Sequence, residues 1–344
     1  MSSIPDSHSG AFRVGVGRDV RAGEHVPVHD LALDLLDQDP GVAWDFLPEH
    51  APELAAETIH DYNAIMLWGP GGVSAATLAG ANRLKLIARF GMGLDAIDLG
   101  ACAEHGVLVT VAPDAVSTAV PAGAMAFVLS LAHRLAEKDR LVRSGGWDDR
   151  FEYVGLGTTG RVLGVIGLGN IGSAVLRMAE PFGFRLLGFD PHTHARQHLI
   201  PAGVEPVDLE TLLRRSDFVC VACPLTEKTR GLIDRDRLAL IGPHAYLVNV
   251  ARGPIVDSHA VADAVRGKRL AGAALDVFEH EPIERDHPLL GLDEVILSPH
   301  AVAYTEAAFR SLGVSACRAV LAVAHGEVPQ NVANPAALDE RKVR

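Results

Sequence analysis

The sequence predicts an α/β protein of two domains, each built as a parallel sheet flanked by helices. Three observations support this fold class. The length of 344 residues is about twice the roughly 150 residues of a typical domain. Short apolar runs alternate with helical stretches along most of the chain, which is typical of βαβ units. A second series of such units follows a loop that contains Trp147, and its first strand ends in a glycine-rich turn after residue 166.

The first series fills roughly the first two fifths of the chain. It ends in a long helix expected over residues 115–142, where Pro121 falls near the start and Gly145-Gly146 provides the stop. The expected strands are 12–16, 63–68, 84–90 and 107–111, and the expected shorter helices are 26–36 and 75–81.

The second series follows a loop that contains Trp147. A last helix is expected over 306–324, and residues 1–10 and 339–344 are expected to be tails. The expected strands are 162–166, 185–189, 218–222, 245–249, 271–275 and 295–297.

Composition excludes several classes of protein. Apolar residues make up 48% and charged residues 22%, so the chain is neither disordered, collagen-like nor a coiled coil. The longest apolar stretch, 119–132, is shorter than the roughly 18 residues that a membrane span needs, so no membrane partner is expected. A net charge of −12 with no basic run argues against nucleic acid. Four cysteines and no secretory pattern over 1–10 indicate a cytoplasmic protein.

A glycine-rich string follows the expected strand at 161–166. Gly167, Gly169 and Gly172 match G-x-G-x-x-G, a helix is expected next, and the following strand ends at Asp190, 18 residues past Gly172. The first glycine permits a tight turn, the second lets the backbone approach a pyrophosphate, and the third lets the helix pack closely. The helix N-terminus offers N–H groups to phosphates. Asp190 can accept hydrogen bonds from ribose hydroxyls and repels a 2′-phosphate, so the pattern favours NAD over NADP.

Three polar residues lie at or soon after the ends of later strands. Arg252 follows the strand 245–249, Glu281 follows 271–275, and His300 follows 295–297. Ligands of open parallel sheets bind beyond the carboxyl ends of the strands, so these side chains are expected to converge. An imidazole can exchange the hydroxyl proton of an alcohol, a carboxylate can orient the ring, and a guanidinium can grip a substrate carboxylate. The set suits hydride transfer from a hydroxy acid.

Together these strings resemble the D-isomer-specific 2-hydroxyacid dehydrogenase family. The resemblance covers about residues 60–335, and the motifs stand in the family's order. The matching segments are 91–98 (GMGLDAID), 167–172 with Asp190, 223–226 (CPLT), 249–253 (NVARG), 275–282 (LDVFEHEP) and 299–300 (PH).

The resemblance implies a doubly wound Rossmann domain that binds NAD, over residues 113–303, inserted into a flavodoxin-like substrate domain made of 1–112 and 304–344. It implies hydride transfer between nicotinamide and C2 of a D-2-hydroxy acid or 2-keto acid. Arg252, Glu281 and His300 would be the catalytic trio, and Met92 and Gly93 would help Arg252 hold the substrate. The implied cofactor-binding residues are Gly167, Gly169, Asn170, Ile171, Gly172, Asp190, Pro224, Thr229, Val250, Ala251 and Asp276.

Two departures from the family leave questions open. Pro121-Ala122-Gly123 replaces an acidic stretch early in the long helix, and the turn at 68–72 is glycine-rich where a polar side chain is usual. Family habit implies a homodimer, with the long helix after Pro113 as its seam. The acid, the direction of the reaction and the oligomeric state stay open.

Alternative interpretations also stand at this point. The chain could be an NAD(H)-sensing binding protein related to corepressors, or a dehydrogenase of formate, phosphite or a phosphorylated hydroxy acid. Cys220 and Cys223 have C-x-x-C spacing but lie in an apolar strand, so core packing is expected. His192, His194 and His198 are expected to form a solvated surface. No metal site is expected.

Overall fold

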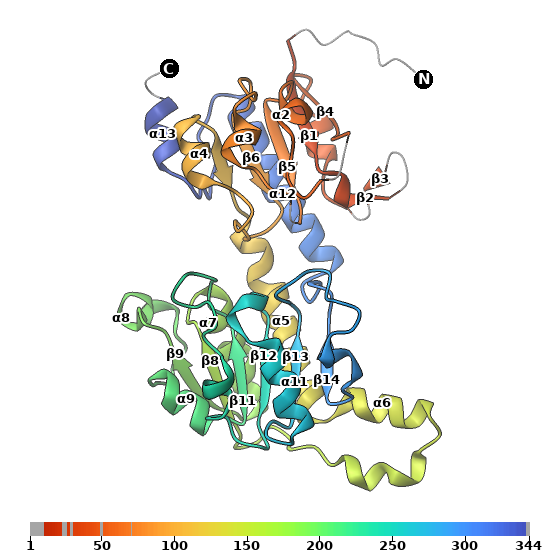
Figure 1. Ribbon diagram of the computed structural model, residues 1–344. Helices are drawn as coiled ribbons and strands as arrows, with labels where there is room; N and C mark the ends of the chain where they lie inside the picture. The colour runs from red at the N-terminus through yellow and green to blue at the C-terminus, as the bar shows by residue number, and fades with distance from the viewer. Residues whose placement is uncertain (1–9, 23–25, 28–29, 49–50, 70, 342–344) are drawn as a thin grey trace. The chain divides into compact units, whose positions relative to one another are not determined.

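The computed structural model describes residues 10–22, 26–27, 30–48, 51–69 and 71–341. The chain divides into two compact units, which we call unit 1 (Met1–Val116 and Tyr304–Arg344) and unit 2 (Ser117–Ala303). Most of the two expected tails, residues 1–9 and 342–344, lies outside the described residues. Figure 1 shows a sheet with helices on its faces in each unit.

Unit 1 contains a five-stranded parallel sheet in the order β4-β1-β5-β6-β7. When these five strands are numbered 1 to 5 in chain order, their spatial order is 2-1-3-4-5. This is the flavodoxin-like order that the resemblance implies. A short antiparallel pair lies beside the main sheet. The strands are β1 (Phe12–Val16), β4 (Val42–Phe46), β5 (Ala64–Leu67), β6 (Leu86–Arg89) and β7 (Leu108–Thr110), with β2 (Arg21–Ala22) and β3 (Val26–Pro27) in the pair.

Three helices of unit 1, α3, α4 and α12, begin at polar caps. Ser74, Asp98 and Thr305 each accept a hydrogen bond from a first-turn N–H, which satisfies a donor that has no partner inside the helix. The helices are η1 (Arg18–Val20), α1 (Asp34–Asp37), α2 (Ala56–Ile59), α3 (Ala75–Leu78), α4 (Leu99–Glu104), α12 (Glu306–Ala324) and α13 (Ala336–Arg341).

Unit 2 contains a seven-stranded parallel sheet in the order β10-β9-β8-β11-β12-β13-β14. This is the doubly wound order, reversing between β8 and β11, and it confirms the predicted fold class. The central strands are buried along their whole length, which explains their unbroken apolar runs. The strands are β8 (Val162–Ile166), β9 (Arg185–Phe189), β10 (Val204–Pro206), β11 (Phe218–Val221), β12 (Tyr246–Asn249), β13 (Gly272–Leu275) and β14 (Val295–Leu297).

Helices cover both faces of this sheet and close two hydrophobic cores. The α-helices are α5 (Pro113–Ala132), α6 (Leu135–Arg143), α7 (Asn170–Ala179), α8 (Thr193–Arg196), α9 (Leu209–Arg215), α10 (Arg235–Leu238) and α11 (Ser258–Arg266). The 3-10 helices are η2 (Trp147–Tyr153), η3 (Glu180–Phe182), η4 (Gln197–Leu199), η5 (Gly253–Ile255) and η6 (Pro288–Gly291).

Two sequence-based expectations are wrong, and two further strands were not expected. The helix expected over 26–36 is instead strand β3 and the short helix α1, and Pro27 cannot donate a helical hydrogen bond. The helix expected over 115–142 is two helices, because Arg134 adopts a left-handed conformation with φ of 51°. The edge strands β4 and β10 were not expected, since their partly exposed residues lack a continuous apolar run.

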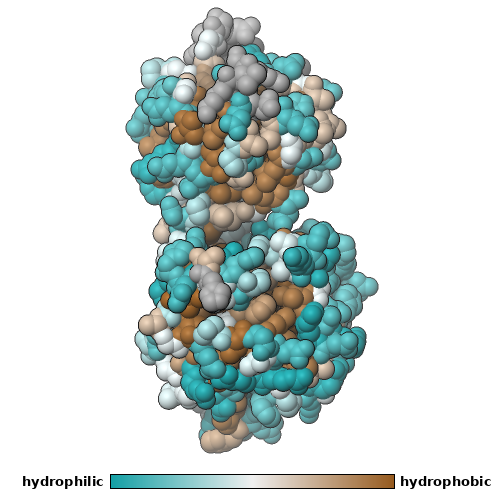
Figure 2. Space-filling view, turned by 90° about the vertical axis from the view of Figure 1, so that its left-hand side faces the viewer, coloured by the Kyte–Doolittle hydropathy of each residue, from teal (hydrophilic) through white to brown (hydrophobic). Residues whose placement is uncertain are grey.

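Two helices of the described chain, α5 and α12, are long and apolar enough to cross a membrane by length and composition. About half of each apolar window is buried, 44% in α5 and 50% in α12. The buried side of α5 packs into a core of unit 2 through residues such as Val128. The buried side of α12 packs into a core of unit 1 through residues such as Val320. On the face shown in Figure 2, hydrophilic residues cover most of each unit and apolar residues show between them.

Candidate active site

The three catalytic candidates follow three neighbouring strands of unit 2. Asn249, Leu275 and Leu297 end β12, β13 and β14, and they are register partners across the sheet. The loops that begin there carry Arg252, Glu281 and His300. Because the strands are parallel and their ends are aligned, all three loops leave the sheet at the same edge (Figure 1).

His300 and Glu281 form the central pair of this edge. Nδ1 of His300 lies 2.8 Å from Oε2 of Glu281. The other carboxylate oxygen accepts the backbone N–H of Phe278 at 3.0 Å. Burial alone would raise the pKa of Glu281, but the hydrogen bonds from His300 and Phe278 and the charges of His300 and Arg252 lower it below its usual value. Glu281 is therefore an ionised acceptor, and Nδ1 carries the proton that it accepts. Nε2 is left as the nitrogen that can exchange a proton with a substrate.

Arg252 lies close enough to act on this pair, since its charge helps to lower the pKa of Glu281. One guanidinium nitrogen, Nη1, donates to the carbonyl oxygen of Ala251 at 2.7 Å. The next residue, Gly253, packs so tightly that a Cβ there would lie 1.9 Å from the backbone of Phe278. This close approach holds the Arg252 loop against the loop that carries Glu281.

Asp276 supports the loop that carries His300. Its Oδ1 accepts the N–H groups of Ala301 and Val302, both at 2.9 Å, and its carbonyl oxygen accepts the N–H of His300 at 2.7 Å. Burial raises the pKa of Asp276, although hydrogen bonds from Ser298 and the two amides oppose the rise. The resemblance implies that Asp276 is a cofactor-binding residue, and in the structure its side chain also braces the loop that carries His300.

The glycine loop lies at the same edge of the same sheet. β8 ends at Ile166, which pairs with Val221 at the end of β11, and Val221 pairs with Asn249 at the end of β12. Gly167 has a φ of 97°, and a Cβ there would lie 2.7 Å from the backbone of Cys223. A Cβ on Gly172 would lie 1.9 Å from the carbonyl oxygen of Gly167. These two glycines serve the turn and the helix packing, as the fingerprint predicts.

Gly169 differs, because the structure leaves room beside it. A Cβ at Gly169 would meet only the Arg196 guanidinium, at 3.5 Å. Gly169 is the N-cap of α7 and provides no side-chain cap for the N–H groups of Asn170 and Ile171. The N-terminus of this 10-residue helix is therefore open to a ligand, and its N–H groups suit the pyrophosphate of a dinucleotide.

Asp190 stands at the end of β9, as expected, but it is already engaged. Its Oδ2 accepts the N–H of Leu168 at 2.9 Å and pairs with Nη1 of Arg196 at 2.8 Å. Its Oδ1 accepts the N–H of His192 at 2.7 Å. Arg196 is not among the predicted site residues, because the stretch after Asp190 is expected to form a solvated surface. The pairing places a cation beside the loop where the adenosine end of a dinucleotide would lie.

The remaining cofactor candidates line two further loops of this edge. Thr229 Oγ1 donates to the carbonyl oxygen of Pro224 at 2.7 Å and accepts the N–H of Thr226 at 2.7 Å, which fixes the turn after β11. Val250 and Ala251 are buried directly after β12. Every cofactor candidate thus belongs to unit 2.

The other two substrate candidates belong to unit 1. Met92 and Gly93 follow β6, and Met92 is exposed. The carbonyl oxygen of Gly93 accepts Nε of Arg89 at 3.1 Å. Within unit 1, this loop lies at the carboxyl end of the sheet.

A second polar cluster lies beside the Glu281 loop. Ligand atoms of His259, Glu279 and His287 lie within 4.8 Å of one another. Nδ1 of His287 accepts the N–H of Leu289, so its Nε2 carries the proton and donates to Ser258 Oγ at 3.0 Å. Ser258 in turn donates to Glu279 at 3.0 Å. These hydrogen bonds link His287, Ser258 and Glu279 to one another, and they hold the first residue of α11 in place.

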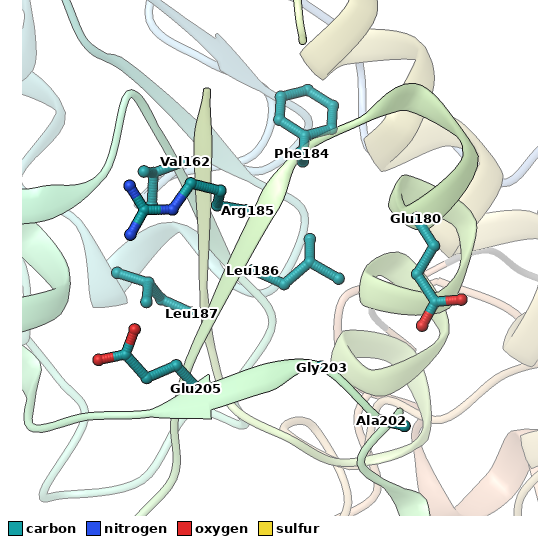
Figure 3. Close-up of a pocket in the computed structure, with 9 residues that line it drawn as sticks. All are labelled: Val162, Glu180, Phe184, Arg185, Leu186, Leu187, Ala202, Gly203 and Glu205. Carbon is teal, nitrogen blue, oxygen red and sulfur yellow. The ribbon is translucent and has the colours of Figure 1, made fainter. Parts of the chain in front are cut away.

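Unit 2 also has a surface hollow of about 540 Å³ (Figure 3). Val162 and Arg185, which begin β8 and β9, help to line it, so it lies at the opposite end of these strands from the glycine loop. Its walls include Leu186 and Leu187, whose side chains lie on opposite sides of β9.

Comparisons with known proteins agree with this geometry. The model of the NAD binding domain of the D-isomer specific 2-hydroxyacid dehydrogenases matches residues 125–302. The chain belongs to the D-isomer-specific 2-hydroxyacid dehydrogenase family. The matched region contains the glycine loop, Asp190 and the three catalytic candidates, all in unit 2. NAD is therefore the cofactor of this family member.

Individual relatives of this family member carry several names. It is 36% identical over 305 residues to a glyoxylate reductase of Thermococcus onnurineus, covering 87% of this chain and 91% of that one. It is also 36% identical over 318 residues to a D-3-phosphoglycerate dehydrogenase of Methanocaldococcus jannaschii, covering 92% of this chain but only 60% of that one. The solved structure of an Aquifex aeolicus D-lactate dehydrogenase, complexed with NAD and lactic acid, matches with a TM-score of 0.79 at 26% identity, covering 91% of this chain and 96% of that one.

Proposed function

We propose that this chain is an NAD-dependent D-2-hydroxyacid dehydrogenase. It transfers a hydride between the nicotinamide and C2 of a D-2-hydroxy acid, or the matching 2-keto acid. The observation that carries the proposal is the 2.8 Å pair between His300 and Glu281, on the sheet edge that also carries the glycine loop. The relatives' names support the class of reaction and leave the acid open.

Each member of the trio has a separate task in this proposal. Nε2 of His300 takes the C2 hydroxyl proton during oxidation and returns it to the carbonyl oxygen during reduction. Glu281 holds the ring through Nδ1 and stabilises the imidazolium. Arg252 grips the substrate carboxylate with two parallel N–H groups. The backbone amides of Met92 and Gly93 add contacts to the same carboxylate. NAD, when bound, accepts the hydride, so the hydroxy acid is oxidised and the proton remains on His300.

A panel of 2-keto acids tests the proposal. NADH oxidation is followed at 340 nm with glyoxylate, pyruvate and larger keto acids, and with NADPH in parallel. We expect at least one keto acid to be reduced with NADH. Tight NADH binding without turnover of any acid would instead identify a nicotinamide-sensing binding protein. Turnover of only formate or phosphite would place the chain in another branch of the superfamily.

The pairing of Glu281 with His300 gives a pH-dependent expectation. The pKa of Glu281 is lowered, so its carboxylate is charged at neutral pH and favours protonated His300. In Glu281→Gln this support is lost. We expect the alkaline fall of kcat/KM for keto acid reduction to move to lower pH. Profiles of the two enzymes that superimpose would contradict the pairing.

Asp190 and Arg196 should set the choice between NADH and NADPH. Asp190→Asn removes the charge that repels a 2′-phosphate and frees Arg196 to meet it. We expect the ratio of kcat/KM for NADH over NADPH to fall about 10- to 100-fold, the scale of one or two hydrogen bonds to a charged group. The double variant Asp190→Asn/Arg196→Ala is the control and should lose the gain with NADPH. An unchanged ratio in Asp190→Asn would refute the assignment.

We also propose that two copies associate through the arm formed by residues 133–155. Figure 1 shows α6 and the segment after it extending from the body of unit 2. This short stretch has five large apolar side chains that are more than half exposed, whereas such residues are scattered elsewhere. They are Leu135, Val142, Trp147, Phe151 and Val154.

The mass in solution tests this association. We expect a dimer by light scattering at micromolar concentration, and a shift toward monomer in Trp147→Ser/Phe151→Ser. Phe182→Ser removes an exposed aromatic ring outside the arm and should leave the dimer intact. A monomeric unmodified chain, or an unaffected arm variant, would contradict the proposed interface.

A further inference from the structure

The backbone of the loop that carries His300 depends on contacts with its neighbours. His300 has a φ of 53°, a left-handed conformation that residues other than glycine rarely adopt. Such a conformation persists only where the surrounding structure holds it. Asp276 supplies the first set of contacts, since its carbonyl oxygen accepts the N–H of His300 at 2.7 Å. Its Oδ1 accepts the N–H groups of Ala301 and Val302, both at 2.9 Å.

A second contact joins this loop to helix α5. Gly123 of α5 lies so close to Val302 that a Cβ on the glycine would stand 2.3 Å from a methyl group of Val302 and 2.6 Å from its carbonyl oxygen. Side chains do not approach backbone atoms so closely, so only glycine fits here without a shift. The side chain of Val302 also packs against the hydrophobic core that contains Ala124, Phe127 and Val128 of the same helix.

Val302 connects the two sets of contacts. Its N–H donates to Asp276 and its carbonyl oxygen lies against Gly123, so one residue is held both by the turn after β13 and by α5. The peptide units between Val302 and His300 are planar and of fixed length, so a shift of Val302 is transmitted to the His300 ring. All of these residues belong to unit 2.

We propose that Gly123 is a positioning residue for His300. Because Gly123 has no side chain, α5 lies against Val302 and fixes the place of Nε2 of His300. A methyl group at position 123 would push the loop from the helix by roughly an ångström. This inference rests on the proposed function, since it concerns the proton that His300 exchanges there. It also gives a physical reason for a glycine within 121–123, where the chain departs from its family.

Steady-state kinetics of Gly123→Ala, with NADH and the best 2-keto acid, test the inference. A misplacement of about 1 Å can cost about 100-fold in rate, and we expect kcat to fall about tenfold or more. The KM of the keto acid depends on Arg252, which lies on another loop, and should change less than about threefold. The Kd for NADH should also change less than about threefold, because the glycine loop follows β8.

A double-mutant cycle with His300→Ala shows whether the effect passes through the imidazole. If Gly123 acts by placing His300, adding Gly123→Ala to His300→Ala should lower the remaining kcat less than about twofold. A merely structural role would lower kcat by about the same factor in both backgrounds. Ala126→Gly is the control, because it weakens α5 at an exposed position, and its kcat should stay within about twofold of the unmodified value.

The outcomes separate this inference from the proposed function. An unaltered kcat in Gly123→Ala, a comparable loss in KM and Kd, or an equal loss with and without His300 would overturn the inference and leave the dehydrogenase assignment standing. If Gly123→Ala does not fold, Val302→Ala loosens the same contact from the loop side, and an unaltered kcat in this variant would overturn the inference equally. We expect a fall of about threefold or more there, again only with His300 present. Absence of turnover of every keto acid by the unmodified chain would overturn both.

Discussion

His300→Ala should lower kcat for keto acid reduction about 10²- to 10⁴-fold, the usual contribution of a positioned general acid. The alanine removes the only nitrogen that we assign to the carbonyl oxygen, and no other proton donor of the trio has a suitable charge state. Glu281 is ionised, since its pKa is lowered, and a guanidinium does not give up its proton at neutral pH.

The distinguishing readout is NADH binding, measured by nicotinamide fluorescence. His300 lies on the loop after β14, whereas the glycine loop follows β8, so the Kd for NADH should change less than about threefold. His244→Ala, which alters an exposed histidine before β12, is the matched control and should keep normal turnover. Turnover near the unmodified level in His300→Ala would remove the assigned role.

Arg252→Ala is expected to lower kcat/KM for the keto acid roughly 30- to 1,000-fold, mainly by raising KM. This corresponds to a loss of about 2–4 kcal/mol of transition-state stabilisation. The loss reflects two charge-assisted hydrogen bonds to the substrate carboxylate. Arg252→Lys keeps the charge without the planar fork and should recover only part of the loss. Both changes are measured by steady-state kinetics at saturating NADH.

Arg235→Ala provides the control for Arg252. Arg235 is an arginine of the same unit whose guanidinium pairs with Asp263 on the surface, so its loss should leave KM unaltered. Full rescue by lysine at position 252 would show that charge alone suffices, and an unaltered KM in Arg252→Ala would exclude the carboxylate grip.

The sequence predicts the carboxyl ends of the central unit 2 strands well because burial is nearly complete there. β11, β12 and β13 are buried at every residue, so their apolar runs are unbroken and the first polar residues after them mark the strand ends. The edge strand β4 has no such apolar run, because its five residues are only half-buried and include Asp45. It was therefore not predicted from the sequence.

Contacts made by loop backbone were not predictable in the same way. Glu281 accepts a hydrogen bond from the N–H of Phe278, and Asp276 accepts hydrogen bonds from the N–H groups of Ala301 and Val302. These contacts depend on how each loop folds back, which the pattern of side chains in the sequence does not indicate. The pair between Asp190 and Arg196 also depends on the turn after β9. The break at Arg134 was hidden because an arginine with positive φ has no sequence signature.

Isotope transfer tests the central claim most directly. The purified chain is incubated with NADH carrying deuterium at C4 of the nicotinamide and with the best 2-keto acid, and the product is analysed by chiral chromatography and mass spectrometry. We expect one deuterium at C2 of the D-2-hydroxy acid when the label occupies the transferred position of the ring. A product of L configuration, or one that lacks deuterium at C2 with either label position, would contradict direct hydride transfer at this site.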